Sequence, residues 1–338
     1  MTLKVALSLV LNAHYRGYIY EKTDELIEVY KNVLRLIDKH GFKVSLFVTG
    51  ATAEIIEEDE ELLRLIKNNL KKGYMEICNT TFSYAILAKL PIKEAREQIK
   101  LANETLAQIF EEAPRGFYPP ESFFDPLLPT ILKELNFSWI LLDPEKCRHE
   151  YGEAVPHVPL EFRGVNGSKI SGVFTCTKWS DLKHLIMLDE LPPPPRLVVV
   201  LLSEKDLFVL GEAEKKLVLL KAILSRVDAE TELISEYIEE VPPAEEVIVG
   251  SLNPQWRLEE LWKEARESIR ILESLAKTKH SVDAFTLLNK AIKSLYLSES
   301  SSTYYRPEDS STGLLELYSC EKAIEAINLA RQGLKILS

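Results

Sequence analysis

Nucleotide-binding motifs and an excess of basic charge are both missing from this 338-residue sequence. No GxGxxG stretch follows the first expected strand and no GxxxxGK[S/T] stretch occurs, which removes the usual signs of a dinucleotide or nucleoside triphosphate site. The chain has 41 Lys and Arg against 52 Asp and Glu, a formal net charge of −11. Nucleic acid and anionic membranes attract a basic face, so we expect neither as a partner.

Clustered cysteines, clustered histidines and long apolar runs are absent as well. The six histidines show no HxH or HxxxH spacing, and we predict no metal and no cofactor. No apolar run is long enough to span a membrane, and the first one, Val5–Leu11, is expected to be a strand and not a signal peptide. Four cysteines form no CxxC pair, which is typical of a reduced, cytoplasmic protein: Cys78, Cys147, Cys176 and Cys320. Gln and Met are scarce beside Glu, Lys and Leu, a composition that hints at a thermophilic source.

The patterns that are present alternate between apolar strands and amphipathic helices. After the strand Val5–Leu11 comes a helical pattern over Thr23–His40. Further strands are expected at 43–48, 75–78, 138–142, 158–162, 169–176 and 196–202, and helices at 53–72, 91–111, 126–135 and 213–225. Repeated alternation of this kind predicts a parallel sheet covered by helices, in a barrel or a doubly wound fold. Because no nucleotide motif is present, we favour the barrel, over residues 1–255.

Beyond residue 258 only helical patterns remain, at 258–276, 281–297 and 314–336. Their apolar stripes predict an all-α helical bundle over residues 256–338, appended to the barrel.

One carboxylate stands out at the end of a short strand in the middle of the chain. Glu121 directly follows Pro119 and Pro120, which cannot donate to a sheet and therefore end the strand and stiffen its exit. The carboxyl ends of barrel strands are where such folds carry their chemistry. Neighbouring aromatic side chains could form a wall for sugar stacking: Phe117, Tyr118, Phe123 and Phe124. The alternative is that Glu121 caps the helix expected from Pro126.

With these elements placed, the sequence resembles glycoside hydrolase family 57. The resemblance is carried by Leu11–Tyr15, Gly73–Ile77, Tyr84–Leu87 followed by Leu90 and Pro91, Gly116–Glu121, and Asp206 five residues before Gly211–Glu212. It implies an incomplete (β/α)7 TIM-like barrel followed by a helical bundle. It also implies an enzyme of the α-amylase or 4-α-glucanotransferase type, with α-glucan or an oligosaccharide as its partner.

The family's motifs imply a role for several residues. Glu121 matches the nucleophile, Asp206 the general acid/base, with Glu204 as the alternative acid, and His14 a contact to the sugar at the cleavage point. Retaining cleavage requires two carboxyl groups about 5 to 5.5 Å apart. The expected sugar platforms are Tyr118, Phe123, Trp139, Trp179 and Trp256. Hydrolysis and transglycosylation share one covalent intermediate, and the sequence leaves both open.

Departures from the family pattern leave two other functions open. Asn12 stands where the family has the first of two histidines, and the histidine usual near Tyr84 is absent. These changes suit a relative that binds carbohydrate or protein without catalysis. The 73–119 segment is also laid out like that of polysaccharide deacetylases, but Leu11–Ala13 and Asn79–Tyr84 carry no Asp pair and no histidine pair for a metal. Deacetylation is therefore the least favoured function.

Overall fold

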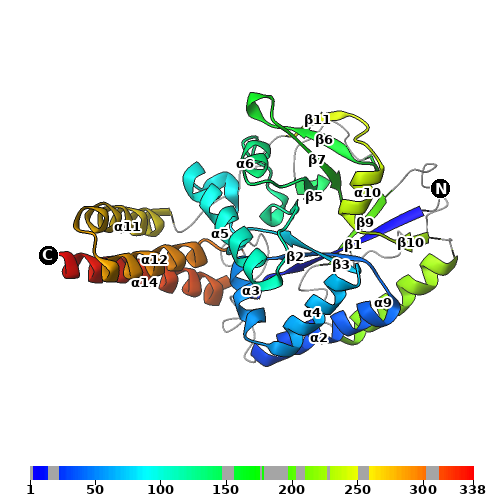
Figure 1. Cartoon of the computed structure of the whole chain (residues 1–338), viewed down its shortest axis with the longest axis horizontal. Helices are drawn as coiled ribbons and strands as arrows, with labels where there is room; N and C mark the ends of the chain where they lie inside the picture. The colour runs from blue at the N-terminus through cyan, green and yellow to red at the C-terminus, as the bar shows by residue number, and fades with distance from the viewer. Residues whose placement is uncertain are drawn as a thin grey trace.

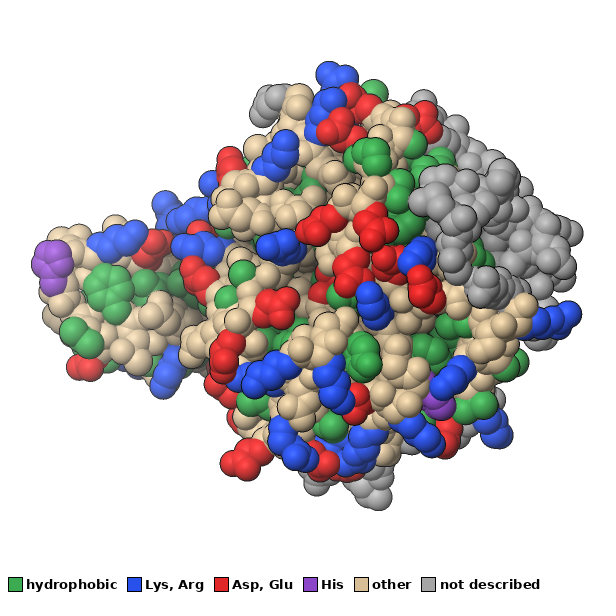
Figure 2. Space-filling model, turned by 45° about the vertical axis from the view of Figure 1, so that its right-hand side comes forward, with side chains coloured by type: hydrophobic (Ala, Val, Ile, Leu, Met, Phe, Trp, Pro, Cys, Tyr) green, Lys and Arg blue, Asp and Glu red, His purple; other side chains and the backbone are tan. Residues whose placement is uncertain are grey.

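The computed structural model describes residues 3–13, 23–146, 156–175, 177–178, 197–202, 210–226, 229–249, 259–301 and 312–338. Figure 1 shows a curled sheet with helices around it and a separate group of helices that projects to one side and holds the C-terminus. On the face shown in Figure 2, Lys and Arg side chains intermingle with Asp and Glu, and the described side chains there form no broad basic face.

One 11-stranded sheet contains all the described strands. They are β1 (Leu3–Leu11), β2 (Val44–Val48), β3 (Met75–Asn79), β4 (Gly116–Phe117), β5 (Trp139–Leu142), β6 (Leu160–Arg163), β7 (Lys169–Phe174), β8 (Thr177–Lys178), β9 (Leu197–Leu202), β10 (Ala229–Thr231) and β11 (Glu246–Ile248). Their order is β11-β6-β7-β5-β4-β3-β2-β1-β9-β8, with β10 also paired to β1. Every pairing is parallel except that of β6 with β7.

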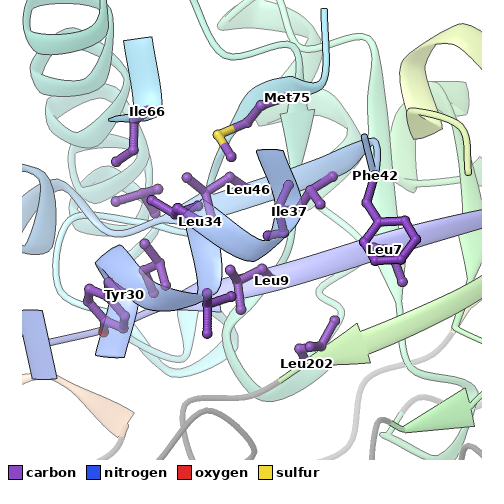
Figure 3. Packing of buried hydrophobic residues seen from close by; sticks show 14 of the residues in the cluster. Leu7, Leu9, Tyr30, Leu34, Ile37, Phe42, Leu46, Ile66, Met75 and Leu202 are labelled. Atoms are coloured by element: carbon purple, nitrogen blue, oxygen red, sulfur yellow. The ribbon is translucent and has the colours of Figure 1, made fainter. Parts of the chain in front are cut away.

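Helices bury the outer face of the central strands. They are α2 (Thr23–His40), α3 (Gly50–Glu57), α4 (Glu60–Lys71), α5 (Ile92–Phe110), α6 (Leu128–Glu134) and α9 (Leu210–Arg226). Alternate residues of a strand face one side, so Leu7 and Leu9 of β1 point outward against Tyr30, Leu34 and Ile37 of α2 (Figure 3). All five side chains are at most 2% exposed, so this layer is part of the buried core.

The inner face of the sheet is filled by side chains and by one short helix. Val10, Phe47, Trp139 and Val199 belong to one buried cluster with Tyr237 of α10 (Ile234–Glu240). The start of α10 contacts the second residues of β2 and β3: Ser45 Oγ accepts from Ile234 N at 3.4 Å, and Glu76 Oε1 accepts from Ser235 N at 3.4 Å. Helix α10 therefore closes the amino-terminal end of the barrel, and the opposite end is left for a site.

The described residues after the barrel form three helices: α11 (Glu259–Lys279), α12 (Val282–Ser298) and α14 (Thr312–Leu337). Their buried cluster also takes in Ala51, Phe82 and Ala102 from the barrel. The predicted order of an α/β barrel followed by a helical region is thus confirmed, while the division at residues 255 and 256 stays a prediction. None of the helices in the described ranges combines the length and the apolar character needed to cross a membrane.

Candidate active site

The carboxyl ends of β1, β2, β3 and β4 lie level with one another, and the neighbouring β5 continues for two more residues. In the register, Leu11 pairs with Val48, Val48 with Asn79, Asn79 with Phe117, and Phe117 with Ile140. The residues that follow these positions are therefore brought to one edge of the sheet. They include Asn12, Thr49, Thr80, Tyr118 and, at the end of β5, Asp143.

Glu121 lies at this edge in an unusual backbone conformation. It is the middle residue of a single 3₁₀ turn, Pro120–Ser122, and has φ 54° and ψ 19°, and Ser122 after it has φ 55°. Left-handed conformations cost L-residues about 1–2 kcal/mol each. The turn is held by Ser122 N, which donates to Pro119 O at 2.7 Å. Pro120 and Ser122 are buried while Glu121 is partly exposed.

The capping alternative for Glu121 is not what the structure shows. Helix α6 begins at Leu128, and its N-cap residue Leu127 makes no side-chain cap. The carboxylate that serves the entry to α6 is Asp125, whose Oδ1 accepts from Leu127 N at 2.7 Å. Glu121 is separated from α6 by several residues and does not cap it.

Two tyrosines lie near Glu121, and one of them also lies near a second carboxylate, Asp143. Burial raises the pKa of the Tyr118 hydroxyl, and the charges of Glu121 and Asp143 raise it further, so both carboxyl groups lie near this ring. Burial also raises the pKa of Tyr84, which interacts with Tyr118 and with the main chain of Glu121. Both hydroxyls therefore stay protonated and neutral at neutral pH.

Asp143 was not among the predicted site residues. It is 6% exposed; its N–H donates to Ser122 Oγ at 2.8 Å, and its Oδ1 accepts from Glu145 N at 3.0 Å. The signal that could have found it is its place directly after the apolar strand β5, at the same sheet edge as Glu121.

The predicted aromatic platforms that the structure describes are buried. Tyr118 is 5% exposed, Phe123 3% and Trp139 1%. The indole of Trp139 lies inside the barrel, edge-on to Phe47 with ring centroids 5.8 Å apart. Because a stacking sugar needs an open ring face, this burial argues against stacking on all three rings.

Five other predicted site residues fall outside the described residues: His14, Trp179, Glu204, Asp206 and Trp256. For the metal, no group of three or more His, Cys, Asp or Glu side chains suited to hold an ion occurs in the part of the chain that the structure describes. In the loop Asn79–Tyr84, which was compared with that of the deacetylases, a polar side chain bonds within the loop: Thr81 N donates to Asn79 Oδ1 at 2.7 Å.

The first half of the chain matches a known sequence family. The model of glycosyl hydrolase family 57 matches residues 5–166. An α-amylase from Pyrococcus abyssi is 27% identical over 129 residues, which cover 38% of this chain and 19% of that protein. The match thus spans about a fifth of the relative's length.

The fold match extends further along the chain. An α-amylase structure from Thermotoga maritima has a TM-score of 0.73 at 12% identity and covers 100% of this chain and 95% of its own. A 4-α-glucanotransferase structure from Thermococcus litoralis has a TM-score of 0.71 at 15% identity and covers 96% of this chain and 58% of its own. These likenesses confirm the predicted fold class. The chain therefore resembles glycosyl hydrolase family 57 in sequence over residues 5–166, and over nearly its whole length it shares its fold with these α-amylase and 4-α-glucanotransferase structures.

Proposed function

We propose that this chain is a glycoside hydrolase or transglycosidase that acts on α-glucan or a related oligosaccharide with retention of configuration. The observation that carries the proposal is the placement of Glu121, a partly exposed carboxylate in a left-handed conformation at the carboxyl end of β4. Strained backbone is concentrated at functional sites when the surrounding structure holds it in place. The α-amylase and 4-α-glucanotransferase among the similar proteins support the same substrate class.

In this reaction the Glu121 carboxylate attacks the anomeric carbon while the bond to the leaving oxygen breaks. The acid, Asp206 with Glu204 as the alternative, gives its proton to that oxygen. Water or a sugar hydroxyl then displaces Glu121 from the covalent intermediate, with the same residue taking the proton as base. His14, Trp179 and Trp256 remain candidates for sugar contacts, while the burial of Tyr118, Phe123 and Trp139 argues against stacking on those three rings.

A non-catalytic binding module is the second candidate. Asn12 favours it, because it stands where the family pattern has a histidine, and so does the segment around Ser83 and Tyr84, which lacks the histidine that the family tends to carry there. An enzyme must bring a second carboxyl group within reach of Glu121, whereas a module that only holds a glucan or a protein need not. Polysaccharide deacetylation is the least supported activity because the described site residues include no metal-ligand cluster.

The test is hydrolysis of soluble starch and a panel of α-linked oligosaccharides at elevated temperature. We expect Glu121→Gln and Asp206→Asn each to lower kcat/KM by roughly 10³-fold or more while the fold is kept. Glu104→Gln, at a 63% exposed side chain on α5, is the matched control and should cleave at the unmodified rate. If Asp206→Asn stays active and Glu204→Gln does not, Glu204 is the acid. A folded, unmodified chain that cleaves no glycan would favour the binding module.

A further inference from the structure

The loop between β3 and α5 is held in a costly conformation beside Glu121. Thr81 has φ 67° and Tyr84 has φ 61°, and neither is glycine. The barrel side of the loop is held by its own hydrogen bonds: Ala85 N donates to Thr81 Oγ1 at 3.1 Å, and Gly50 N donates to Thr81 O at 3.2 Å. Non-glycine residues with positive φ persist only where surrounding contacts hold them. For Thr81 and Tyr84, part of these contacts comes from outside the barrel.

The helical region holds the other side of the same loop. Ser301 N donates to Tyr84 O at 3.0 Å, and Ala85 and Ser300 form an antiparallel bridge. One residue earlier in the loop, Ser83 Oγ donates to Tyr296 O at 2.5 Å. The turn at the end of α12 is thus joined to Ser83, Tyr84 and Ala85 in succession.

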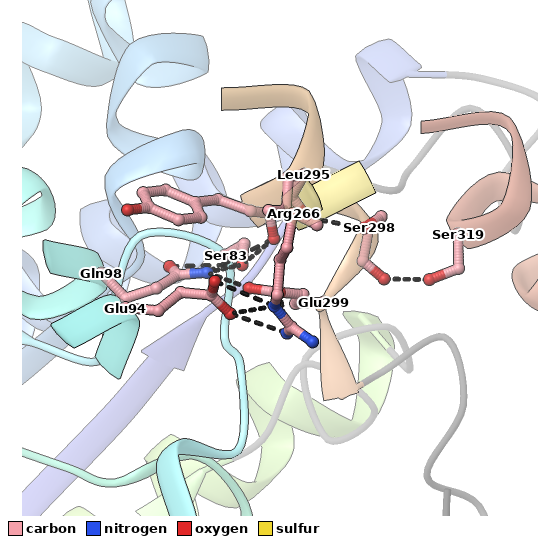
Figure 4. Close-up of polar contacts among 9 residues, drawn as sticks. Ser83, Glu94, Gln98, Arg266, Leu295, Ser298, Glu299 and Ser319 are labelled. Atoms are coloured by element: carbon pink, nitrogen blue, oxygen red, sulfur yellow. Dashed lines mark hydrogen bonds and ion pairs between the residues drawn. The ribbon is translucent and has the colours of Figure 1, made fainter. Parts of the chain in front are cut away.

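A partly buried ionic network, with the fully buried Glu299 in it, fixes that turn against the barrel (Figure 4). Arg266 of α11 contacts Glu94 of α5 at 2.7 Å and Glu299 at 2.6 Å, and Gln98 Nε2 donates to Glu299 Oε2 at 3.3 Å. Glu299 is fully buried; burial, and then the neighbouring Glu94, raises its pKa. Removing one partner of such a buried network leaves the others uncompensated, which is strongly unfavourable. The helical region therefore has little freedom to shift relative to the loop.

The side chain of Tyr84 carries this anchoring to the proposed nucleophile. Tyr84 is 8% exposed and packs in the same buried cluster as Tyr118, three residues before Glu121. Its hydroxyl interacts with the main-chain N–H of Glu121 and with the Tyr118 hydroxyl. The Tyr118 hydroxyl in turn interacts with Ser122. The two tyrosines thus contact both residues of the left-handed pair, Glu121 and Ser122.

We propose that Tyr84 is a positioning residue that holds Glu121 in its left-handed conformation, and that the turn at 299–301 of the helical region keeps Tyr84 in place. The importance of this for catalysis rests on the proposed function, in which Glu121 is the nucleophile. A misplacement of about 1 Å at a reacting group can cost about 100-fold in rate. The helical region is then part of the catalytic apparatus although it contributes no reacting group.

Amide hydrogen exchange tests the positioning without any substrate. Tyr84→Phe removes only the hydroxyl, so we expect exchange of the 118–124 peptide to become roughly 3- to 10-fold faster, the effect of one lost hydrogen bond. Tyr237→Phe at the opposite end of the barrel interior is the matched control and should leave this peptide unchanged. Equal exchange of the 118–124 peptide in Tyr84→Phe and the unmodified chain would overturn the proposal.

Ser83→Ala tests the part played by the helical region and also serves if Tyr84→Phe does not fold. It removes the hydroxyl that donates to Tyr296 O, and we expect faster exchange at both 80–85 and 118–124. A change confined to 80–85 would separate the helical region from Glu121 and overturn that half of the proposal.

Kinetics separate failure of this inference from failure of the proposed function. With a cleaved glucan, Tyr84→Phe should lower kcat about tenfold with KM nearly unchanged, because the hydroxyl orients Glu121 and does not bind substrate. Faster exchange in Tyr84→Phe together with full activity in Glu121→Gln would support Tyr84 as a positioning residue and rule out Glu121 as the nucleophile. Unchanged exchange in Tyr84→Phe together with an inactive Glu121→Gln would support Glu121 as the nucleophile and rule out Tyr84 as its positioning residue.

Discussion

The two ends of the barrel treat their buried polar groups differently. At the amino-terminal end, Glu76 Oε1 accepts from Ser45 Oγ at 2.5 Å and from the start of α10, and the strand backbone is regular. At the carboxyl end, Thr81, Tyr84, Glu121 and Ser122 all have positive φ. At the amino-terminal end the buried polar groups bond to one another and close the barrel. At the carboxyl end the backbone adopts energetically unfavourable conformations around a partly exposed carboxylate. The contrast assigns stability to the first end and chemistry to the second.

The largest expected effect concerns the core between the two ends. Trp139→Ala should lower the free energy of unfolding by about 3–5 kcal/mol, because a fully buried indole is lost and a cavity remains. Denaturant unfolding measures this change. If the free energy of unfolding falls by less than about 1 kcal/mol and sugar binding weakens, Trp139 contacts the sugar and is not only a core residue.

A smaller loss of unfolding free energy is expected when a methyl group is added at Gly116, against the ring of Trp139. A Cβ on Gly116 would lie 2.2 Å from Trp139 Cζ2, so Gly116→Ala should cost about 1–3 kcal/mol through displacement of the indole. In a double variant, Trp139→Phe with Gly116→Ala, the smaller ring leaves room for the added methyl group and should recover part of that loss. A double-mutant cycle would then show non-additive losses. Additive losses would show that the two residues do not share this contact.

At the carboxyl end the comparison is between two substitutions that both delete the proposed nucleophile. Glu121→Gly should be more stable than Glu121→Ala by about 1 kcal/mol, because glycine adopts φ 54° without the penalty of a Cβ. Thermal or urea unfolding of both inactive variants gives the difference. Equal stability would mean that the left-handed conformation carries no strain, and the contrast between the two ends would lose its basis.

The smallest effect is the pH dependence at the amino-terminal end. Burial raises the pKa of Glu76 above its ordinary value of 4.5, so the folded chain keeps a proton that the unfolded chain releases. Its contribution to stability is therefore complete below about pH 4.5 and is lost as the pH rises through the raised pKa. Glu76→Gln removes this loss.

We expect the stability of Glu76→Gln relative to the unmodified chain to rise with pH between 4 and 8, by about 1 kcal/mol or less. Urea unfolding across that range measures it. A difference that stays constant with pH would show that Glu76 keeps the same proton in both states.

Much of the fold could be predicted because its elements are long and periodic. The helix expected over Thr23–His40 has those bounds in the structure, and the three helices after the barrel were found to within a few residues. The helix expected at 53–72 is instead two, because Asp59 accepts from Leu62 N at 2.9 Å and starts a new helix without a Gly or Pro signal. The short elements β10, α10 and β11 were missed, since three to seven residues show no period of their own.

The candidate site could be predicted in position but not in conformation. Pro119 and Pro120 were sufficient to predict that the strand ends before Glu121 at a barrel edge. The left-handed turn at Glu121 involves Tyr84, which is distant in sequence, and local pattern carries no trace of that contact. The burial of Trp139 could not be predicted, because the sequence of a strand does not tell whether an aromatic ring faces the barrel interior or a ligand.

The most direct test of the central claim is to trap the covalent intermediate. The unmodified chain is treated with a 5-fluoro-α-glucosyl fluoride, which forms a glycosyl-enzyme that is slow to hydrolyse, and is then digested and analysed by mass spectrometry. We predict that the peptide containing Glu121 gains the mass of one fluoroglucosyl group, and that Glu121→Gln gains none. A label on any other carboxylate would contradict the assignment of Glu121 as the nucleophile, as would the absence of label on a chain that cleaves α-glucan.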